Sequence, residues 1–182
     1  MREHKQPKEF YKLTVNDEFY TPEYAVLPLL EFLEPFKGKI IWCPFDKTDS
    51  EYVKVFKEFG YYVVFSHIDY EQSFYSYEPD YFDLIISNPP FSNKKQTFKR
   101  LLSFNKPFAM LMTLTWLNDS APKQLFKDKD LQLLMFEERI KYKNGNIEDK
   151  INFSSAYYCY NFLPKQIIMR SLKDNKRQMR LF

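Results

Sequence analysis

The sequence predicts an α/β domain built around a largely parallel β-sheet, and three observations lead to that prediction. Short apolar segments typical of strands alternate with segments of helical periodicity. The first apolar segments are continuous, as expected when helices cover both faces of a sheet. The chain has 182 residues, of which 45% are hydrophobic and 19% aromatic, enough to bury one sizeable core. We therefore expect a single domain over residues 1–182, with residues 1–16 loosely ordered and residues 172–182 forming a basic tail.

The first predicted element is a helix over residues 20–33, "YTPEYAVLPLLEFL". Thr21 can cap its start, and Pro22 suits the first helical position, where an N–H would have no partner. Apolar residues recur at helical spacing along the rest of the segment. Pro28 lies inside this pattern and should kink or restart the helix.

Three buried strands and one helix come next. Ser50 can cap a helix over residues 51–59, and Gly60 can end it. An aromatic-rich loop over residues 70–80 precedes the third strand. The three strands are predicted at residues 38–45, 61–68 and 82–87.

The second part of the chain continues the alternation. Helices are predicted over residues 94–104 and 121–129. Strands are predicted over residues 106–114, 131–142 and 154–164. Ligands of parallel sheets bind beyond the carboxyl ends of the strands, which places a candidate site at residues 43–50, 66–69 and 88–91.

Composition and charge narrow the class of protein. A formal net charge of +3 is compatible with a nucleic-acid partner but does not require one. No apolar run approaches the roughly 20 residues needed to cross a bilayer, and the first ten residues lack the apolar core of a signal peptide. Cys43 and Cys159 have no metal-ligand spacing and lie in apolar contexts, as buried thiols do in a reducing compartment. We expect a cytoplasmic protein with no membrane partner and no metal site.

The segment "DLIISNPPFSN" places a rigid corner at the end of a buried strand. Pro89 and Pro90 donate no backbone hydrogen bond, so they stop the strand and fix the loop. The Asn88 amide oxygen and the Pro89 carbonyl are then two fixed acceptors, suited to a planar amine with two N–H groups. Phe91 can stack on the ring that carries the amine. The corner alone is also compatible with a simple rigid turn.

This corner resembles the catalytic motif of S-adenosylmethionine-dependent N6-adenine methyltransferases. Thr21-Pro22 is similar to the cofactor motif at the start of the same enzymes. The segment "IIWCPFDKTDSEYVKVFKEFGYYVVFSHID" resembles the cofactor segment of a subgroup of these enzymes. The subgroup comprises restriction-modification enzymes and short phage-borne relatives, in which a Cys-Pro-x-Asp turn replaces the usual Gly-rich one. "FDLIISNPPFS" and "SSAYYCYNFLPKQI" fit too, so the resemblance extends over about residues 20–168. It implies a three-layer α/β/α Rossmann-like class I methyltransferase fold, mostly parallel, with an antiparallel strand near the C-terminal end.

The resemblance also implies roles for individual residues. Asp46 would accept the ammonium group of S-adenosylmethionine. Ser66, His67 or Asp69 would meet the ribose hydroxyls, and Ser73 and Phe74 fall where relatives hold the cofactor adenine. The remaining cofactor residues, at the helix start and in the turn, are Tyr20, Thr21, Pro22, Cys43, Pro44 and Phe45. The catalytic residues would be Asn88, Pro89, Pro90 and Phe91.

The expected partner is nucleic acid, and DNA is favoured over RNA. Basic Lys94 and Lys95 follow the corner and could meet phosphates. Tyr158 and Tyr160 share one face of a predicted strand that lines the target-base pocket in the family; packing inside the sheet is the alternative. The chain has no segment that looks like a separate target-recognition domain. Recognition would then come from loops, from a protein partner or from self-association.

The sequence therefore predicts an enzyme that transfers a methyl group from S-adenosylmethionine to the N6 amine of adenine in DNA. The alternatives are an RNA adenine methyltransferase and a non-catalytic phage protein that keeps the fold. Cofactor affinity separates the two enzymes from the third reading. The nucleic acid required for turnover separates the two enzymes from each other.

Overall fold

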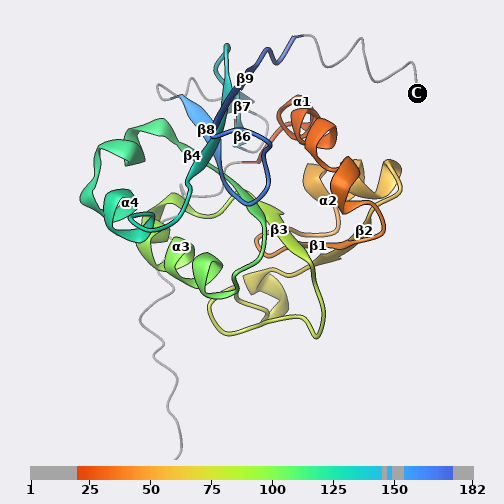
Figure 1. Ribbon diagram of the computed structural model, residues 1–182. Coiled ribbons are helices and arrows are strands. Elements are labelled where there is room, and N and C mark those ends of the chain that lie inside the picture. The colour runs from red at the N-terminus through yellow and green to blue at the C-terminus, as the bar shows by residue number, and fades with distance from the viewer. Residues whose placement is uncertain (1–19, 145–146, 149–153, 174–182) are drawn as a thin grey trace, which may run out of the picture.

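The computed structural model describes residues 20–144, 147–148 and 154–173. In these residues a seven-stranded sheet has the strand order β2-β1-β3-β4-β8-β5-β9. Helices α1 and α2 lie on one side of it and α3 and α4 on the other (Figure 1). The fold is thus the expected three-layer α/β/α arrangement. The helices are α1 (Glu23–Val26), α2 (Glu51–Glu58), α3 (Lys94–Ser103) and α4 (Ser120–Leu125).

Four parallel strands form the first part of the sheet. The chain alternates strand and helix here, and each strand is a short apolar run, as predicted. β2 is paired only with β1 among the described strands, so it is an edge of the sheet. The four are β1 (Ile40–Cys43), β2 (Tyr62–Phe65), β3 (Leu84–Ser87) and β4 (Phe108–Thr113).

The second part of the sheet contains the antiparallel strand. β8 (Ser155–Tyr160) lies between β4 and β5 (Gln132–Phe136) and runs antiparallel to both, as the fold class requires. β9 (Ile167–Arg170) pairs with β5 in parallel and forms the other edge. The sequence did not predict β9 as a separate strand. A short antiparallel pair, β6 (Lys143–Asn144) and β7 (Ile147–Glu148), lies outside this sheet, where a loop was expected.

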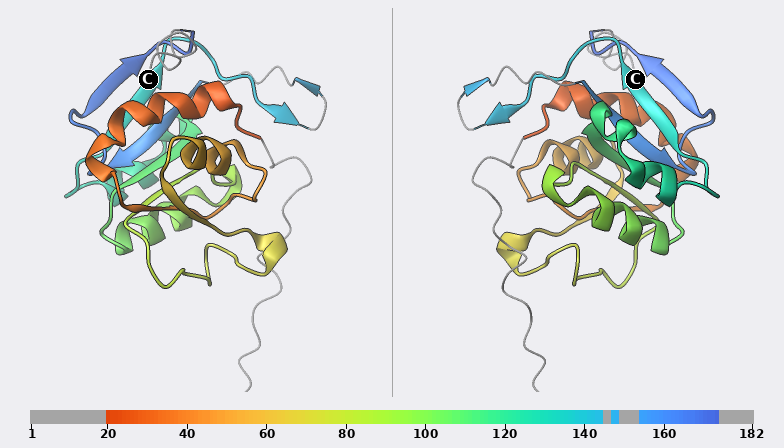
Figure 2. Two further views of the ribbon diagram at one scale, coloured as in Figure 1. Left: turned by 90° about the vertical axis from the view of Figure 1, so that its right-hand side faces the viewer. Right: turned by 90° about the vertical axis from the view of Figure 1, so that its left-hand side faces the viewer.

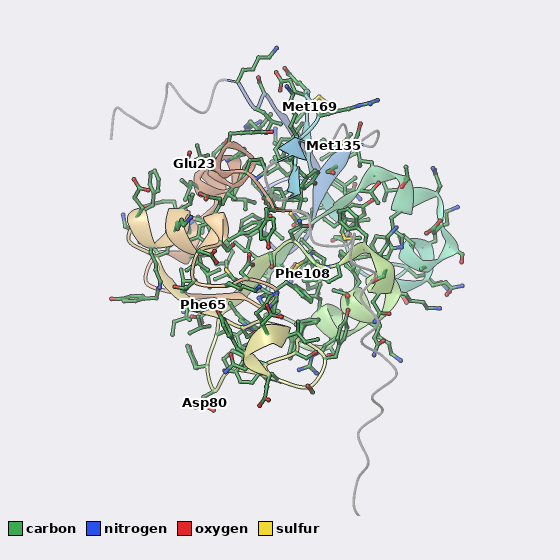
Figure 3. All side chains as sticks on the ribbon, turned by 180° about the vertical axis from the view of Figure 1, so that it is seen from behind. Glu23, Phe65, Asp80, Phe108, Met135 and Met169 are labelled. Atoms are coloured by element: carbon green, nitrogen blue, oxygen red, sulfur yellow. The ribbon has the colours of Figure 1, made fainter. Side chains whose placement is uncertain are left out.

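Alternation along the strands builds two cores, one on each face of the sheet. Ile41 and Cys43 of β1 pack with α1 and α2 on one face. Trp42, between them in sequence, packs on the other face with Phe98 of α3 and Phe126 after α4. The two views in Figure 2 look at these faces in turn, and Figure 3 shows side chains filling both. The loops at the strand ends are therefore supported from both sides.

The N-terminal helix differs from its prediction. It begins at Glu23, its N-cap is Pro22, and no side chain caps it, so the prediction that Thr21 caps this helix was wrong. The α-helical turn ends at Val26 and continues as a 3₁₀ helix over Leu27–Phe32. Pro28 explains the change, because it has no N–H to donate to an α-helical ladder. The predicted restart at this proline is confirmed.

Helix α2 has the expected ends. The Ser50 hydroxyl accepts a hydrogen bond from the Tyr52 N–H at 3.3 Å, as an N-cap residue does. Gly60 follows the last turn with φ of 81°, a conformation that favours glycine. None of the helices in the described part of the chain is both long and apolar enough to cross a membrane.

Candidate functional site

The loops that follow β1, β2 and β3 meet at one edge of the sheet. Cys43, the last residue of β1, lies opposite Phe65, the last residue of β2. Trp42 lies opposite Ile85 of β3, so the end of β3 is at the same level. In both views of Figure 2 the short turn after β2 and the β6–β7 pair extend on the same side of the molecule. This is the edge at which a parallel sheet binds its ligands.

The Asn-Pro-Pro-Phe corner follows β3 directly. Pro89 is buried, whereas Asn88, Pro90 and Phe91 are half-buried. Phe91 packs against the aromatic core below α3. A 3₁₀ turn over Phe91–Asn93 then leads into α3. The corner therefore joins a buried strand to a helix, and its ring is partly accessible, whereas the Asn88 Oδ1 atom is itself buried.

Asp46 connects the loop after β1 to this corner. Its Oδ2 atom accepts a hydrogen bond of 2.5 Å from the hydroxyl of Ser87, the residue before Asn88. Its Oδ1 atom accepts another from the hydroxyl of Ser50, at the start of α2. Only 7% of Asp46 is exposed. The carboxylate thus lies inside the protein, between two loops of the site.

Burial also changes the acid strength of Asp46. Loss of water around the carboxylate raises its pKa from 3.8 to about 6, while the hydrogen bonds from Ser50 and Ser87 act in the opposite direction. The negative charge of Asp46 also affects the pKa values of neighbouring side chains. Burial raises the pKa of Cys43 and of Tyr52, and the nearby Asp46 carboxylate raises both further.

A second buried polar group lies behind Asp46. The hydroxyls of Tyr52 in α2 and Tyr157 in β8 are 2.9 Å apart. Tyr157 donates a hydrogen bond of 3.0 Å to the Ala25 carbonyl in α1. This pair joins α1, α2 and the sheet beneath the candidate site. Tyr157 lies in the segment "SSAYYCYNFLPKQI", but no role was predicted for it.

Ser66, one of the residues predicted to meet the ribose, has an internal structural role. It is completely buried and its hydroxyl accepts the indole N–H of Trp42 at 3.0 Å. The same hydroxyl lies 3.4 Å from the Pro44 carbonyl. Its backbone also bonds to Cys43 and to Asp46. Ser66 therefore fixes the loop after β1 against the loop after β2.

His67 and Asp69 are more accessible. The His67 Nδ1 atom accepts the Asp69 N–H at 3.1 Å, so its proton in the neutral ring is on Nε2. The Asp69 carboxylate, with 53% of its side chain exposed, forms an ion pair with Lys47 of the loop after β1. The hydrogen bond from Lys47 lowers the pKa of Asp69. Asp69 is thus an ionised carboxylate at the surface of the candidate site.

The loop after His67 packs its rings on the sheet. Phe74 is buried, with its ring centre 4.9 Å from that of Phe45 and 5.5 Å from that of Trp42. Ser73 is also buried and its hydroxyl accepts the Tyr75 N–H. The structure brings together Phe45 and Phe74, two of the residues predicted to hold the cofactor. Both rings belong to one aromatic cluster.

The helix start and the turn complete the predicted cofactor set. Tyr20 is exposed, whereas Thr21 and Pro22 are buried against the domain. In the turn, Cys43 and Pro44 are buried. Only Tyr20 of these five presents most of its side chain to solvent.

The two tyrosines predicted to contact nucleic acid differ in position and in burial. Tyr158 is completely buried, and its hydroxyl donates to the Thr113 carbonyl. Tyr160 pairs with Phe108, the first residue of β4, and therefore lies at the opposite end of the sheet from the corner. Both side chains are on the same face, as predicted; Tyr158 packs inside the domain, and Tyr160 packs half-buried against the same core. The burial of Tyr158 favours the packing alternative for that residue.

The basic residues after the corner divide into two kinds. Lys95 is exposed and Lys94 half-exposed, both in the first turn of α3. Arg100, further along α3, lies over the rings of Phe74 and Phe104 and donates to the Tyr77 carbonyl. Arg100 therefore holds the aromatic loop in place, whereas Lys94 and Lys95 remain candidates for phosphate contacts.

Comparisons with known proteins agree with the fold. No protein-family model and no curated protein matches the sequence. A structure from Pyrococcus horikoshii, of a protein proposed to be an RNA methyltransferase, has a TM-score of 0.53 and 13% identity, and the match covers 90% of this chain and 93% of that one. Another, from Listeria monocytogenes, is of a proposed class I S-adenosylmethionine-dependent methyltransferase, with a TM-score of 0.48, 12% identity and coverage of 89% and 69%. The first comparison shows that the chain has a methyltransferase fold.

Proposed function

We propose that this protein transfers a methyl group from S-adenosylmethionine to the N6 amine of adenine in DNA. One observation carries the proposal: the Asn-Pro-Pro-Phe corner lies at the carboxyl end of β3, beside the loops after β1 and β2, in a methyltransferase fold. The fold supports the class of reaction. The corner and its resemblance to N6-adenine enzymes support the choice of adenine.

The corner would activate the amine through hydrogen bonds. The Asn88 amide oxygen and the Pro89 carbonyl would accept the two N–H groups of adenine N6. An aromatic amine is a poor nucleophile because its lone pair is delocalised into the ring. Two acceptors favour a pyramidal nitrogen, and their bonds strengthen as positive charge develops there. Phe91 would hold the base by stacking.

The residues at the sheet edge fit the cofactor. When bound, S-adenosylmethionine supplies an electrophilic methyl group on a sulfonium. Asp69 offers an ionised, exposed carboxylate to the ribose hydroxyls, and the half-buried Phe45 ring, supported from below by the buried Phe74, offers an aromatic surface to the adenine. Tyr20 could cover the site from the helix start. This fit rests on the chemistry of the side chains present.

A DNA substrate requires the target base to leave the helical stack before it reaches the corner. The exposed lysines in the first turn of α3, Lys94 and Lys95, would then meet the adjacent phosphates. DNA as the substrate rests on the resemblance to restriction-modification enzymes. Methylation of RNA adenine by the same corner is the second outcome of the assay below.

The experiment pairs cofactor binding with single-turnover methyl transfer. Calorimetric titration measures the affinity for S-adenosylmethionine, and radiolabelled methyl groups are followed on DNA and RNA of matched sequence. Asn88→Ala should bind the cofactor normally and slow methyl transfer by about 100-fold or more. The variant removes one of the two acceptors whose hydrogen bonds strengthen in the transition state. Near-normal turnover in this variant would overturn the role of the corner.

Asn105→Gly is the matched control. It also removes an asparagine side chain, but at the opposite end of the sheet, where φ of 51° suits glycine. Its turnover should equal that of the unchanged protein. Transfer to RNA and not to DNA would overturn the choice of substrate and keep the reaction.

A further inference from the structure

We propose that Asp46 is a positioning residue, which ties the loop after β1 to the catalytic corner through Ser87 and so sets the orientation of Asn88. The inference rests on the proposed function, because it concerns the same site. It assigns Asp46 a different task from the ammonium contact that the sequence resemblance implies. The observation behind it is the pair of hydroxyl groups that bind the two carboxylate oxygens.

The two hydroxyls come from different parts of the chain. Ser50 follows Asp46 by four residues and begins α2, so its bond stays within one loop. Ser87 is 41 residues away and ends β3, so its bond of 2.5 Å joins two neighbouring strands beyond the point where their ladder ends. The next residue after Ser87 is Asn88. A shift of the carboxylate therefore acts on the first residue of the corner.

The position of Asp46 favours this task over direct contact with a ligand. The residue is 7% exposed, and each oxygen already accepts a hydrogen bond from a protein hydroxyl. Its backbone N–H is also used, by the Ser66 carbonyl at 3.2 Å. Asp69, by contrast, presents its carboxylate to solvent at the same edge. Asp46 is therefore held by Ser50, Ser87 and Ser66, as expected for a residue that supports other groups.

This arrangement couples the loop after β1 to catalysis. Hydrogen bonds to an ionised acceptor are stronger than those between neutral groups, so Ser87 holds a defined place at the end of β3. The two prolines then carry that placement through the corner, because they leave it little freedom. Misplacement of a reacting group by about 1 Å can slow a reaction about 100-fold. Loss of the Ser87 bond should therefore lower the rate with little effect on cofactor affinity.

The test compares two serines that bind the same carboxylate. Ser87→Ala should lower the single-turnover rate about 10–100-fold and change the dissociation constant for S-adenosylmethionine by less than about threefold. Ser50→Ala removes the other bond but keeps the link to β3, so its rate should fall less than about threefold. Equal rates for Ser87→Ala and the unchanged protein would overturn the proposal.

Asp46→Asn separates positioning from direct cofactor binding. In a positioning role, it should leave cofactor affinity within about threefold, and combining it with Ser87→Ala should slow the reaction no more than Ser87→Ala alone, since both act through one contact. If the carboxylate bound the cofactor ammonium, affinity would fall by more than about 10-fold, because a charged hydrogen bond would be lost. That result would overturn the proposal.

A measurement without turnover distinguishes this proposal from the proposed function. Backbone order parameters from NMR report whether Asn88 and Phe91 become more mobile. The order parameters of Asn88 and Phe91 should fall in Ser87→Ala and stay unchanged in Ser50→Ala. If the unchanged protein transfers no methyl group but the two variants differ in this way, the proposed function is wrong and the positioning role of Asp46 stands. If the unchanged protein transfers methyl groups and the order parameters of Ser87→Ala do not change, the positioning role of Asp46 is wrong and the proposed function stands.

Discussion

Two carboxylates lie at the same edge of the sheet and are held in opposite ways. Asp46 is buried, bound by two hydroxyl groups, and burial raises its pKa to about 6. Asp69 is exposed and bound by Lys47, whose hydrogen bond lowers its pKa. A place at the ligand-binding edge therefore does not define what a carboxylate does. The buried one supports the loops, whereas the exposed one is accessible to a ligand.

The largest expected difference is in the pH dependence of stability. The pKa of Asp46 is higher in the folded state than the usual 3.8, so its contribution is fully present below pH about 4 and is lost as pH rises through about 6. A shift of about two pKa units corresponds to about 3 kcal/mol in the free energy of unfolding. Asp46→Asn, measured by urea unfolding between pH 4 and 7.5, should lack this fall. The cysteine and tyrosines that face the carboxylate keep raised pKa values and do not titrate in this range: Cys43, Tyr52 and Tyr157.

Asp128→Asn is the control for this measurement. Asp128 is exposed after α4, so removal of its charge should leave the pH dependence unchanged. If Asp46→Asn and the unchanged protein lose the same free energy over this range, the buried charge is not the cause. The contrast between the two carboxylates would then be lost.

The next effect is the loss of one hydrogen bond to the buried carboxylate. Ser87→Ala should lower the free energy of unfolding by about 2 kcal/mol at pH 7.5, because a bond to a charged group is lost inside the protein. The loss should be smaller at pH 4.5, where Asp46 is protonated. Ser103→Ala removes an exposed hydroxyl that bonds to the Arg100 carbonyl and should cost less than about 0.5 kcal/mol. Equal losses at the two pH values would contradict the expected charge on Asp46.

The smallest effect belongs to the exposed carboxylate. Asp69→Asn should lower the free energy of unfolding by at most about 1 kcal/mol in low salt, because solvent screens an exposed ion pair. The pKa of Asp69 is lowered in the folded state, so this contribution is present at neutral pH and is lost as pH falls. In 1 M salt the difference should vanish. A difference that survives high salt would show that Asp69 is more strongly held than its exposure suggests.

The first part of the fold could be predicted because its signals are local. The strands from β1 to β4 are continuous apolar runs, and Ser50 and Gly60 mark the ends of α2. The strand β9 could not be predicted in the same way. Its exposed residues, Ile167 and Met169, are as apolar as the buried Ile168, so the sequence shows no alternation, and three apolar residues are too few to indicate a buried strand. Its pairing with β5 depends on where the rest of the sheet places it.

The site was predictable only in part, for a similar reason. Alternation correctly placed Tyr158 and Tyr160 on one face, but it cannot say at which end of the sheet they lie. That is set by register, which pairs Tyr160 with the first residue of β4. Likewise, Asp46 was predictable as a loop carboxylate, whereas its contact with Ser87 depends on the adjacency of β1 and β3. A serine directly before the Asn-Pro-Pro-Phe corner was the one signal present in the sequence.

The surroundings of Trp42 provide the protein with an optical probe of its own site. The indole is buried against Phe74, Phe82 and Phe104, and its N–H donates to Ser66, at the end of β2. Fluorescence of this residue therefore depends on how the chain after β2 packs on the sheet. Replacing Trp116, the other tryptophan, with phenylalanine would leave Trp42 as the sole tryptophan of the chain. Its emission wavelength would then report rearrangement of that loop in real time, without any added label.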